Sequence, residues 1–159
     1  MTDKITPFLW FDGNAEEAVK FYVSIFRKAK IGRVTRYPEG GPGKPGSVMT
    51  IEFKLEGQDY IALNGGPDFK FNEAVSLLVD CKDQKEVDYY WDQLLQGGGK
   101  PVACGWLKDR FGLSWQICPV SALKLYTSKD KAKVQRAFQA MLGMVKFDVA
   151  AFERAAKGR

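Results

Sequence analysis

The sequence predicts an α+β protein built from two tandem βαβββ modules, followed by a helical C-terminal extension. Three observations lead to this prediction. Short runs of residues alternate between apolar and polar, longer segments repeat apolar residues at spacings of three and four, and these segments come in the same order in both halves. The halves share this plan without obvious identity, as LWFDGNAEEAVKFY beside LVDCKDQKEVDYYW illustrates.

The first module is expected at about residues 4–64. A strand from Ile5 to Phe11 leads into the helical stretch NAEEAVKFYVSIF, for which Asn14 is a suitable N-cap. Strands are then expected over 31–37, 48–55 and 60–64. The segment PEGGPGKPG at 38–46 is rich in proline and glycine, so it is predicted to be a loop.

The second module is expected at about residues 73–119, after the linker GGPDFKF at 65–71. A strand from Ala74 to Cys81 precedes the helix DQKEVDYYWDQLL, which Asp83 can cap. Three glycines at 97–99 end that helix. Two strands, over 102–107 and 113–117, complete the module.

Helical patterns continue beyond Pro119. Ser128 is the predicted N-cap of KDKAKVQRAFQAML, Gly143 is expected to end that helix, and Asp148 to cap VAAFERAAK. The expected organisation is therefore one domain over residues 1–120, made of the two modules, and a helical extension over 121–159.

The bulk composition narrows the class of protein. The net charge is +5, but the basic residues are scattered and many lie in the C-terminal third, which indicates a solvated helical surface, with no nucleic-acid partner expected. No apolar run approaches the ~18 residues of a membrane span, and MTDKITPFLWF lacks the features of a signal peptide. We therefore expect a cytoplasmic protein with no membrane partner.

The chain contains no histidine. This removes the commonest general base at neutral pH and the commonest transition-metal ligand, and it excludes Ser-His-Asp catalysis, Cys-His catalysis and histidine-based zinc sites. Three cysteines without CxxC spacing also argue against a disulfide framework.

Three long segments resemble one known family. PFLWFDGNAEEAVKFYVSIF, LNGGPDFKFNEAVSLLVDCKDQKEVDYYWDQL and CGWLKDRFGLSWQICP are similar to the PhnB-like branch ("3-demethylubiquinone-9 3-methyltransferase-like") of the vicinal oxygen chelate superfamily. That superfamily includes glyoxalase I, bleomycin-resistance proteins and extradiol dioxygenases. The resemblance covers about residues 5–119. It implies two βαβββ modules whose mixed sheets curl around a pocket, and a homodimer.

The same resemblance implies where metal ligands would lie. Metal-dependent members use four pocket-facing positions, usually His, Gln or Glu, and these fall near Pro7, Asn64 and Ser76 and on Gln116. Proline has no donor atom and the other three side chains are neutral, whereas divalent ions prefer anionic oxygen or imidazole ligands. We therefore expect no metal and no other cofactor.

A ligand pocket is predicted from strand alternation together with the resemblance. Alternation sends Ser114 and Gln116 to one face of their strand, and Leu113, Trp115 and Ile117 to the face packed under the helices. The predicted pocket residues are Pro7, Leu9, Asn64, Ser76, Leu78, Ser114 and Gln116. Either these polar groups bind a small organic molecule, or they satisfy backbone atoms or a buried water.

Other groups are candidate chemical sites. Glu52 and Tyr60, on adjacent predicted strands, could act as acid or base if buried, or be a solvent-facing and a packing residue. Cys104 or Cys118 could be a nucleophile, but no histidine can activate it and a buried cysteine commonly acts as a small apolar residue. The glycine clusters at 38–46 and 97–99 are turns without phosphate-binding context.

These observations favour a metal-independent small-molecule binding protein of the glyoxalase and bleomycin-resistance type, with an unknown ligand. The alternative is an enzyme of the same superfamily, including the methyltransferase of the branch label. Asp12-Gly13-Asn14 follows the first strand, but no GxGxG motif for S-adenosylmethionine is present.

Overall fold

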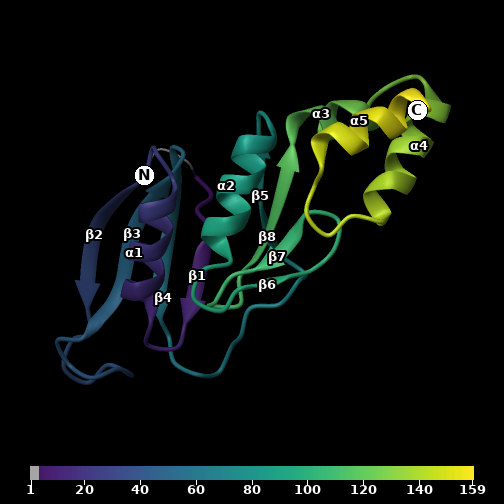
Figure 1. Ribbon diagram of the computed structural model, residues 1–159. Coiled ribbons are helices and arrows are strands. Elements are labelled where there is room, and N and C mark those ends of the chain that lie inside the picture. The colour runs from purple at the N-terminus through teal and green to yellow at the C-terminus, as the bar shows by residue number, and fades with distance from the viewer. Residues whose placement is uncertain (1–3) are drawn as a thin grey trace. The chain divides into compact units, whose positions relative to one another are not determined.

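The computed structural model describes residues 4–159 and contains two compact units. The first ends at Phe71, and the second runs from Asn72 to Arg159 (Figure 1). The boundary directly follows the predicted linker at 65–71. Each unit contains one four-stranded mixed sheet and one helix from a βαβββ module, which confirms the predicted α+β fold.

The first unit follows the predicted order of elements. It consists of β1 (Phe8–Phe11), α1 (Ala15–Ile25), β2 (Lys30–Arg36), β3 (Val48–Leu55) and β4 (Gln58–Asn64). The sheet has the order β1-β4-β3-β2, with β1 parallel to β4 and the other pairs antiparallel. The first strand begins later than predicted, because Pro7 has no amide hydrogen to donate to a ladder.

The second unit repeats this plan. Its module consists of β5 (Ser76–Cys81), α2 (Gln84–Leu94), β6 (Lys100–Pro101), β7 (Trp106–Lys108) and β8 (Ser114–Pro119). The sheet has the order β5-β8-β7-β6, and β5 runs parallel to β8. The first and last strands of each module are thus parallel neighbours, which is the duplication that the sequence pattern predicted.

The strand predicted over 102–107 is wrong for most of its length. Only Trp106 and Leu107 of that range lie in a strand, while β6 is a separate pair of residues before it. Cys104 and Gly105 have φ angles of 56° and 81°, in the left-handed region. A strand cannot continue through two such residues, so the chain turns between β6 and β7.

The extension belongs to the second unit and contains α3 (Val120–Tyr126), α4 (Lys131–Leu142) and α5 (Val149–Lys157). Ser128 was wrongly predicted as the N-cap of α4. That position is Asp130, whose side chain accepts a hydrogen bond from Lys133 N at 3.0 Å. Gly143 is the C-cap of α4, as predicted.

Two of the predicted helix caps are confirmed. Asp83 accepts a hydrogen bond from Glu86 N at 3.0 Å at the start of α2, and Asp148 accepts one from Ala151 N at 2.8 Å at the start of α5. In both cases the carboxylate satisfies an amide of the first helical turn that has no partner within the helix.

Segment 144–149 attaches the extension to the β6–β7 turn. Cys104 N and Gly105 N donate to the carbonyl oxygens of Met144 and Val145, at 2.7 and 2.8 Å. The buried Phe147 ring lies against Gly105, where an added Cβ would approach it to 2.7 Å. Glycine at this position therefore permits the close packing of the extension.

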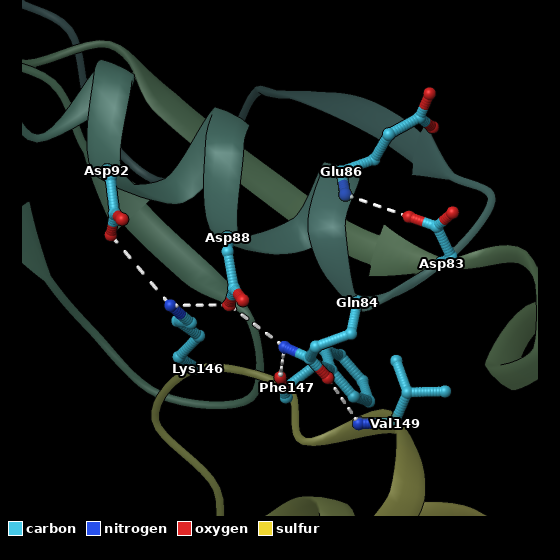
Figure 2. A network of polar contacts seen from close by, with 8 residues as sticks. All are labelled: Asp83, Gln84, Glu86, Asp88, Asp92, Lys146, Phe147 and Val149. Atoms are coloured by element: carbon cyan, nitrogen blue, oxygen red, sulfur yellow. Dashed lines mark hydrogen bonds and ion pairs between the residues drawn. The ribbon is translucent and has the colours of Figure 1, made fainter.

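A polar network, defined here as the clasp, connects the same segment to α2 (Figure 2). Gln84 Nε2 donates to Phe147 O at 3.0 Å, and Gln84 Oε1 accepts from Val149 N at 2.8 Å. Lys146 forms an ion pair with Asp88 at 2.6 Å.

Among the helices of residues 4–159, none combines the length and apolar character needed to cross a membrane.

Candidate functional site

The two faces of β8 have different environments. Leu113, Trp115 and Ile117 are almost fully buried, and Trp115 and Ile117 pair with Leu77 and Val79 on the side of the sheet that α2 covers. The prediction that these three residues pack under a helix is therefore confirmed. Ser114 and Gln116 alternate with them and lie on the opposite face.

Strand register brings four of the predicted pocket residues together. In the β5–β8 ladder, Ser76 lies beside Ser114 and Leu78 beside Gln116. Residues paired in register place their side chains on the same face of the sheet, so these four residues form one surface, defined here as the β5–β8 face. Leu78, which is 49% exposed, gives this surface an apolar part.

The polar groups of the four residues that define the β5–β8 face are uncharged. Gln116 Nε2 donates a hydrogen bond to Ser76 Oγ at 2.8 Å. Ser114 is only 1% exposed, and its Oγ has no hydrogen-bond partner within residues 4–159. A buried hydroxyl without a partner costs about 1–3 kcal/mol, so this oxygen is an unsatisfied group, which a ligand could reach only when a covering side chain moves.

Two further residues share this face and were missed from the sequence. The β7–β8 ladder pairs Trp106 with Gln116 and Lys108 with Ser114. Lys108 forms an ion pair with Glu73, and this hydrogen bond lowers the pKa of the Glu73 carboxyl. The register of the hairpin around Asp109 could have identified both residues, but the wrongly extended strand over 102–107 obscured it.

A buried aspartate holds this hairpin in shape. Asp109 Oδ1 accepts hydrogen bonds from Phe111 N at 2.9 Å and Leu113 N at 3.1 Å, and Asp109 Oδ2 accepts one from Trp115 Nε1 at 2.8 Å. One carboxylate therefore fixes both the turn and the strand that follows it. The positions of Ser114 and Gln116 depend on this arrangement.

Three predicted pocket residues lie in the first unit. Leu9 is buried beside Ala62, and Pro7 directly precedes β1. Asn64, at the end of β4, accepts a hydrogen bond from Ala15 N at 2.9 Å and donates to Glu16 Oε2 at 2.8 Å. The role of these three residues in a ligand pocket stays a prediction.

Asn64 also lines a cavity of about 310 Å³ inside the first unit. Asp12 and Glu16 supply carboxylates to its wall, next to the start of α1. Tyr37 also lines it, and its hydroxyl donates to Asn64 O at 2.7 Å. The polar groups of Asn64 in this wall are thus used in bonds within the unit.

The predicted cap of α1 is wrong in its details. Asn14 occupies the N-cap position, but its side chain makes no capping hydrogen bond, and Asn64 Oδ1 accepts from the first helical amide instead. The cap is therefore supplied across 49 residues of sequence by the neighbouring strand. No local sequence pattern contains that information.

This exchange of roles predicts different effects for two asparagines. Asn64→Ala is expected to lower the free energy of unfolding by about 1–2 kcal/mol, because Ala15 N and Glu16 lose their partner. Asn14→Ala, the matched control, is expected to change it by less than about 0.5 kcal/mol. Urea denaturation followed by circular dichroism measures both, and equal effects would contradict the assignment.

Glu52 and Tyr60 do not form an acid–base pair. Tyr60 pairs with Phe53 in the β3–β4 ladder and stacks on its ring at 5.3 Å, so Glu52 points to the other face of the sheet. Glu52 forms an ion pair with Arg33, and burial raises the pKa of the Tyr60 hydroxyl. These contacts agree with the structural alternative for both residues.

The buried cysteines are poor nucleophiles. Burial raises the pKa of the Cys81 thiol to about 12 and that of the Cys118 thiol to about 11. Both are therefore protonated at neutral pH, whereas the thiolate is the reactive form.

Within residues 4–159, no group of three or more His, Cys, Asp or Glu side chains could hold a metal ion.

Comparisons with known proteins agree with this geometry. Tandem βαβββ modules with the strand orders described above define a glyoxalase-like α+β protein. The PhnB protein from Bacillus cereus is 39% identical over 72% of this chain and 97% of its own, with a TM-score of 0.65. Protein PA1353 from Pseudomonas aeruginosa is 18% identical over 72% and 95%, with a TM-score of 0.58, and shares the fold.

The family follows from a longer match. The profile of the family described as 3-demethylubiquinone-9 3-methyltransferase matches residues 3–118. This chain belongs to that family, as the resemblance of its three segments predicted. Among curated proteins, none matches the chain.

Proposed function

We propose that this chain is a metal-independent small-molecule binding protein whose ligand contacts the β5–β8 face. The observation that carries the proposal is the buried Ser114 hydroxyl, which has no hydrogen-bond partner among residues 4–159. Native structures rarely leave such a group unpaired, so each case calls for an explanation. A ligand oxygen or nitrogen would supply the partner once a side chain that covers Ser114 Oγ moves aside.

The groups around Ser114 favour a neutral or weakly polar organic molecule, because Lys108, the charged neighbour of Ser114 on this face, is already paired with Glu73. A side-chain amide has two hydrogens and one carbonyl oxygen. The hydrogen bond from Gln116 to Ser76 uses only one of the two hydrogens. Leu78 and Trp106 provide apolar contact area on the same face. A few fixed hydrogen-bonding groups beside apolar side chains are typical of small-molecule sites.

Metal independence is proposed from side-chain chemistry. Ser76, Asn64 and Gln116 are neutral and Pro7 offers no donor atom, so the four positions that hold ions in metal-dependent relatives supply no charge to compensate a divalent cation.

We further propose a cytoplasmic homodimer without a nucleic-acid partner, as the resemblance and composition predicted.

The name of the family favours a second candidate, methyl transfer from S-adenosylmethionine. Neither sheet has the run of adjacent parallel strands that forms a nucleotide-binding Rossmann sheet, because each contains one parallel pair at its edge. Methyl transfer by this chain would therefore need a different cofactor site.

A binding experiment separates these candidates. Thermal-shift screening would compare a library of small aromatic and carbonyl compounds with S-adenosylmethionine, Zn²⁺ and Mn²⁺, and titration calorimetry would measure each compound that stabilises the protein. We expect Ser114→Ala to weaken binding of a library compound about five- to tenfold, the equivalent of about one hydrogen bond.

Ser121→Ala is the matched control, since Ser121 Oγ is also buried without a hydrogen-bond partner among residues 4–159 but lies on α3. It should leave the affinity unchanged. Tight binding of S-adenosylmethionine would favour methyl transfer instead. Stoichiometric binding of a metal ion, or equal losses in both serine variants, would contradict the proposal.

A further inference from the structure

The net positive charge of the chain comes entirely from the extension. Residues 121–159 contain nine Lys or Arg and three Asp or Glu, a net charge of +6, whereas residues 1–120 contain fifteen and sixteen, a net charge of −1. The family match ends at residue 118, before this segment. Such an asymmetry indicates an anionic partner for the basic segment.

The same segment exposes large apolar side chains. Tyr126, Phe138 and Leu142, defined here as the apolar stripe, are 36%, 43% and 52% exposed. Tyr126 and Phe138 meet edge to face with ring centroids 6.3 Å apart, and Phe138 and Leu142 are one helical turn apart on α4. The three side chains therefore form a contiguous surface.

Two exposed lysines lie near the apolar stripe along the chain. Lys131 lies two helical turns before Phe138, hence on the same face of α4, and it is exposed. Lys124 is exposed near the end of α3, two residues before Tyr126 and so on another side of that helix, where it adds to the positive charge around the stripe. A lysine can lay its aliphatic stem along an apolar surface while its ammonium group reaches an anion.

The charge decides which partner this surface fits. A second copy of the chain, docked through the apolar stripe, would bring two extensions of net charge +6 together, and like charges across an interface oppose association. A nucleic acid would use the lysines and could stack on the aromatic rings, but it would leave Leu142 without a role. An anionic lipid surface uses both kinds of side chain.

We propose that the apolar stripe, with Lys124 and Lys131, docks peripherally on an anionic lipid surface. The apolar side chains would enter the boundary between headgroups and acyl chains, and the ammonium groups would contact lipid phosphates. The expectation of no membrane partner rested on the absence of a spanning segment, and this docking needs none. It is independent of the proposed ligand site, because no residue is shared.

Vesicle flotation tests this proposal on the full chain. Vesicles of phosphatidylcholine with phosphatidylglycerol should bind the protein at low salt, and vesicles of phosphatidylcholine alone should not. Phe138→Ser with Leu142→Ser should reduce binding at least about tenfold, through lost apolar burial. Lys124→Gln with Lys131→Gln should also reduce it about tenfold or more, since each lysine near an anionic surface contributes about fivefold.

The matched control is Phe69→Ser with Val75→Ser, which removes two side chains of 65% and 67% exposure outside the extension. This variant should bind the anionic vesicles as the parent does. Absence of vesicle binding, or binding that the Phe138 and Leu142 substitutions leave unchanged, would overturn the proposal. Loss of a dimer in those variants, measured by analytical ultracentrifugation, would assign the apolar stripe to a second copy and overturn it as well.

Discussion

Asp109→Ala is expected to lower the free energy of unfolding by about 3–5 kcal/mol. The substitution removes one carboxylate and leaves Phe111 N, Leu113 N and Trp115 Nε1 without their acceptor in the β7–β8 hairpin. Asp109 is only 3% exposed, so water cannot readily replace the lost bonds. Each unsatisfied buried donor carries a desolvation penalty.

Urea denaturation at neutral pH, followed by tryptophan fluorescence, measures this effect. Asp109→Asn should cost less, because its amide oxygen can still accept from two backbone amides, while its NH₂ group faces the indole N–H of Trp115. Asp68→Ala, in the exposed linker, is the control and should shift the unfolding free energy by less than about 0.5 kcal/mol. Similar values for Asp109→Ala and Asp68→Ala would contradict the role assigned to Asp109.

Phe147→Ala is expected to cost about 3–5 kcal/mol and to release the extension from the second module. The ring fills the space above Gly105 and meets Phe152 edge to face, with centroids 5.7 Å apart. Its removal leaves a cavity between segment 144–149 and the β6–β7 turn. The clasp through Gln84 is then the main remaining connection from α2 to this segment.

Hydrogen exchange distinguishes this local effect from global unfolding. In the Phe147→Ala variant, amides of α4 and α5 should exchange faster, while those of β3 and β4 in the first unit keep their protection. Val145→Ala is the control, since Val145 neighbours Phe147 along the segment but is 52% exposed. Uniform loss of protection throughout the chain, or no loss in α4 and α5, would contradict this account.

Features encoded by neighbouring residues were predictable from the sequence. The caps at Asp83 and Asp148 were predicted because an N-cap side chain bonds to an amide three residues later. The alternation of apolar and polar residues along a strand is also a local signal, and it correctly placed Trp115 and Ile117 in the core. The repeated βαβββ order followed from these local signals taken in sequence.

Features that depend on distant residues were not predictable. Asn64 caps α1 from another strand, and a local reading assigned this role to Asn14. Trp106 and Lys108 join the β5–β8 face only through the register of a hairpin whose first strand is interrupted by left-handed backbone at Cys104 and Gly105. The buried hydroxyl of Ser114, which carries the functional proposal, becomes visible only when its surroundings are known.

The most direct test of ligand binding at the β5–β8 face is a nuclear magnetic resonance titration that follows side-chain amides. The probe is the library compound that most stabilises the protein in the thermal-shift screen. We predict that the Nε2 signals of Gln116 shift until the site is saturated, while the Nε2 signals of Gln84, which donates to Asp88 and Phe147 outside the predicted pocket, stay in place. Unchanged Gln116 signals on saturation with that compound would contradict it.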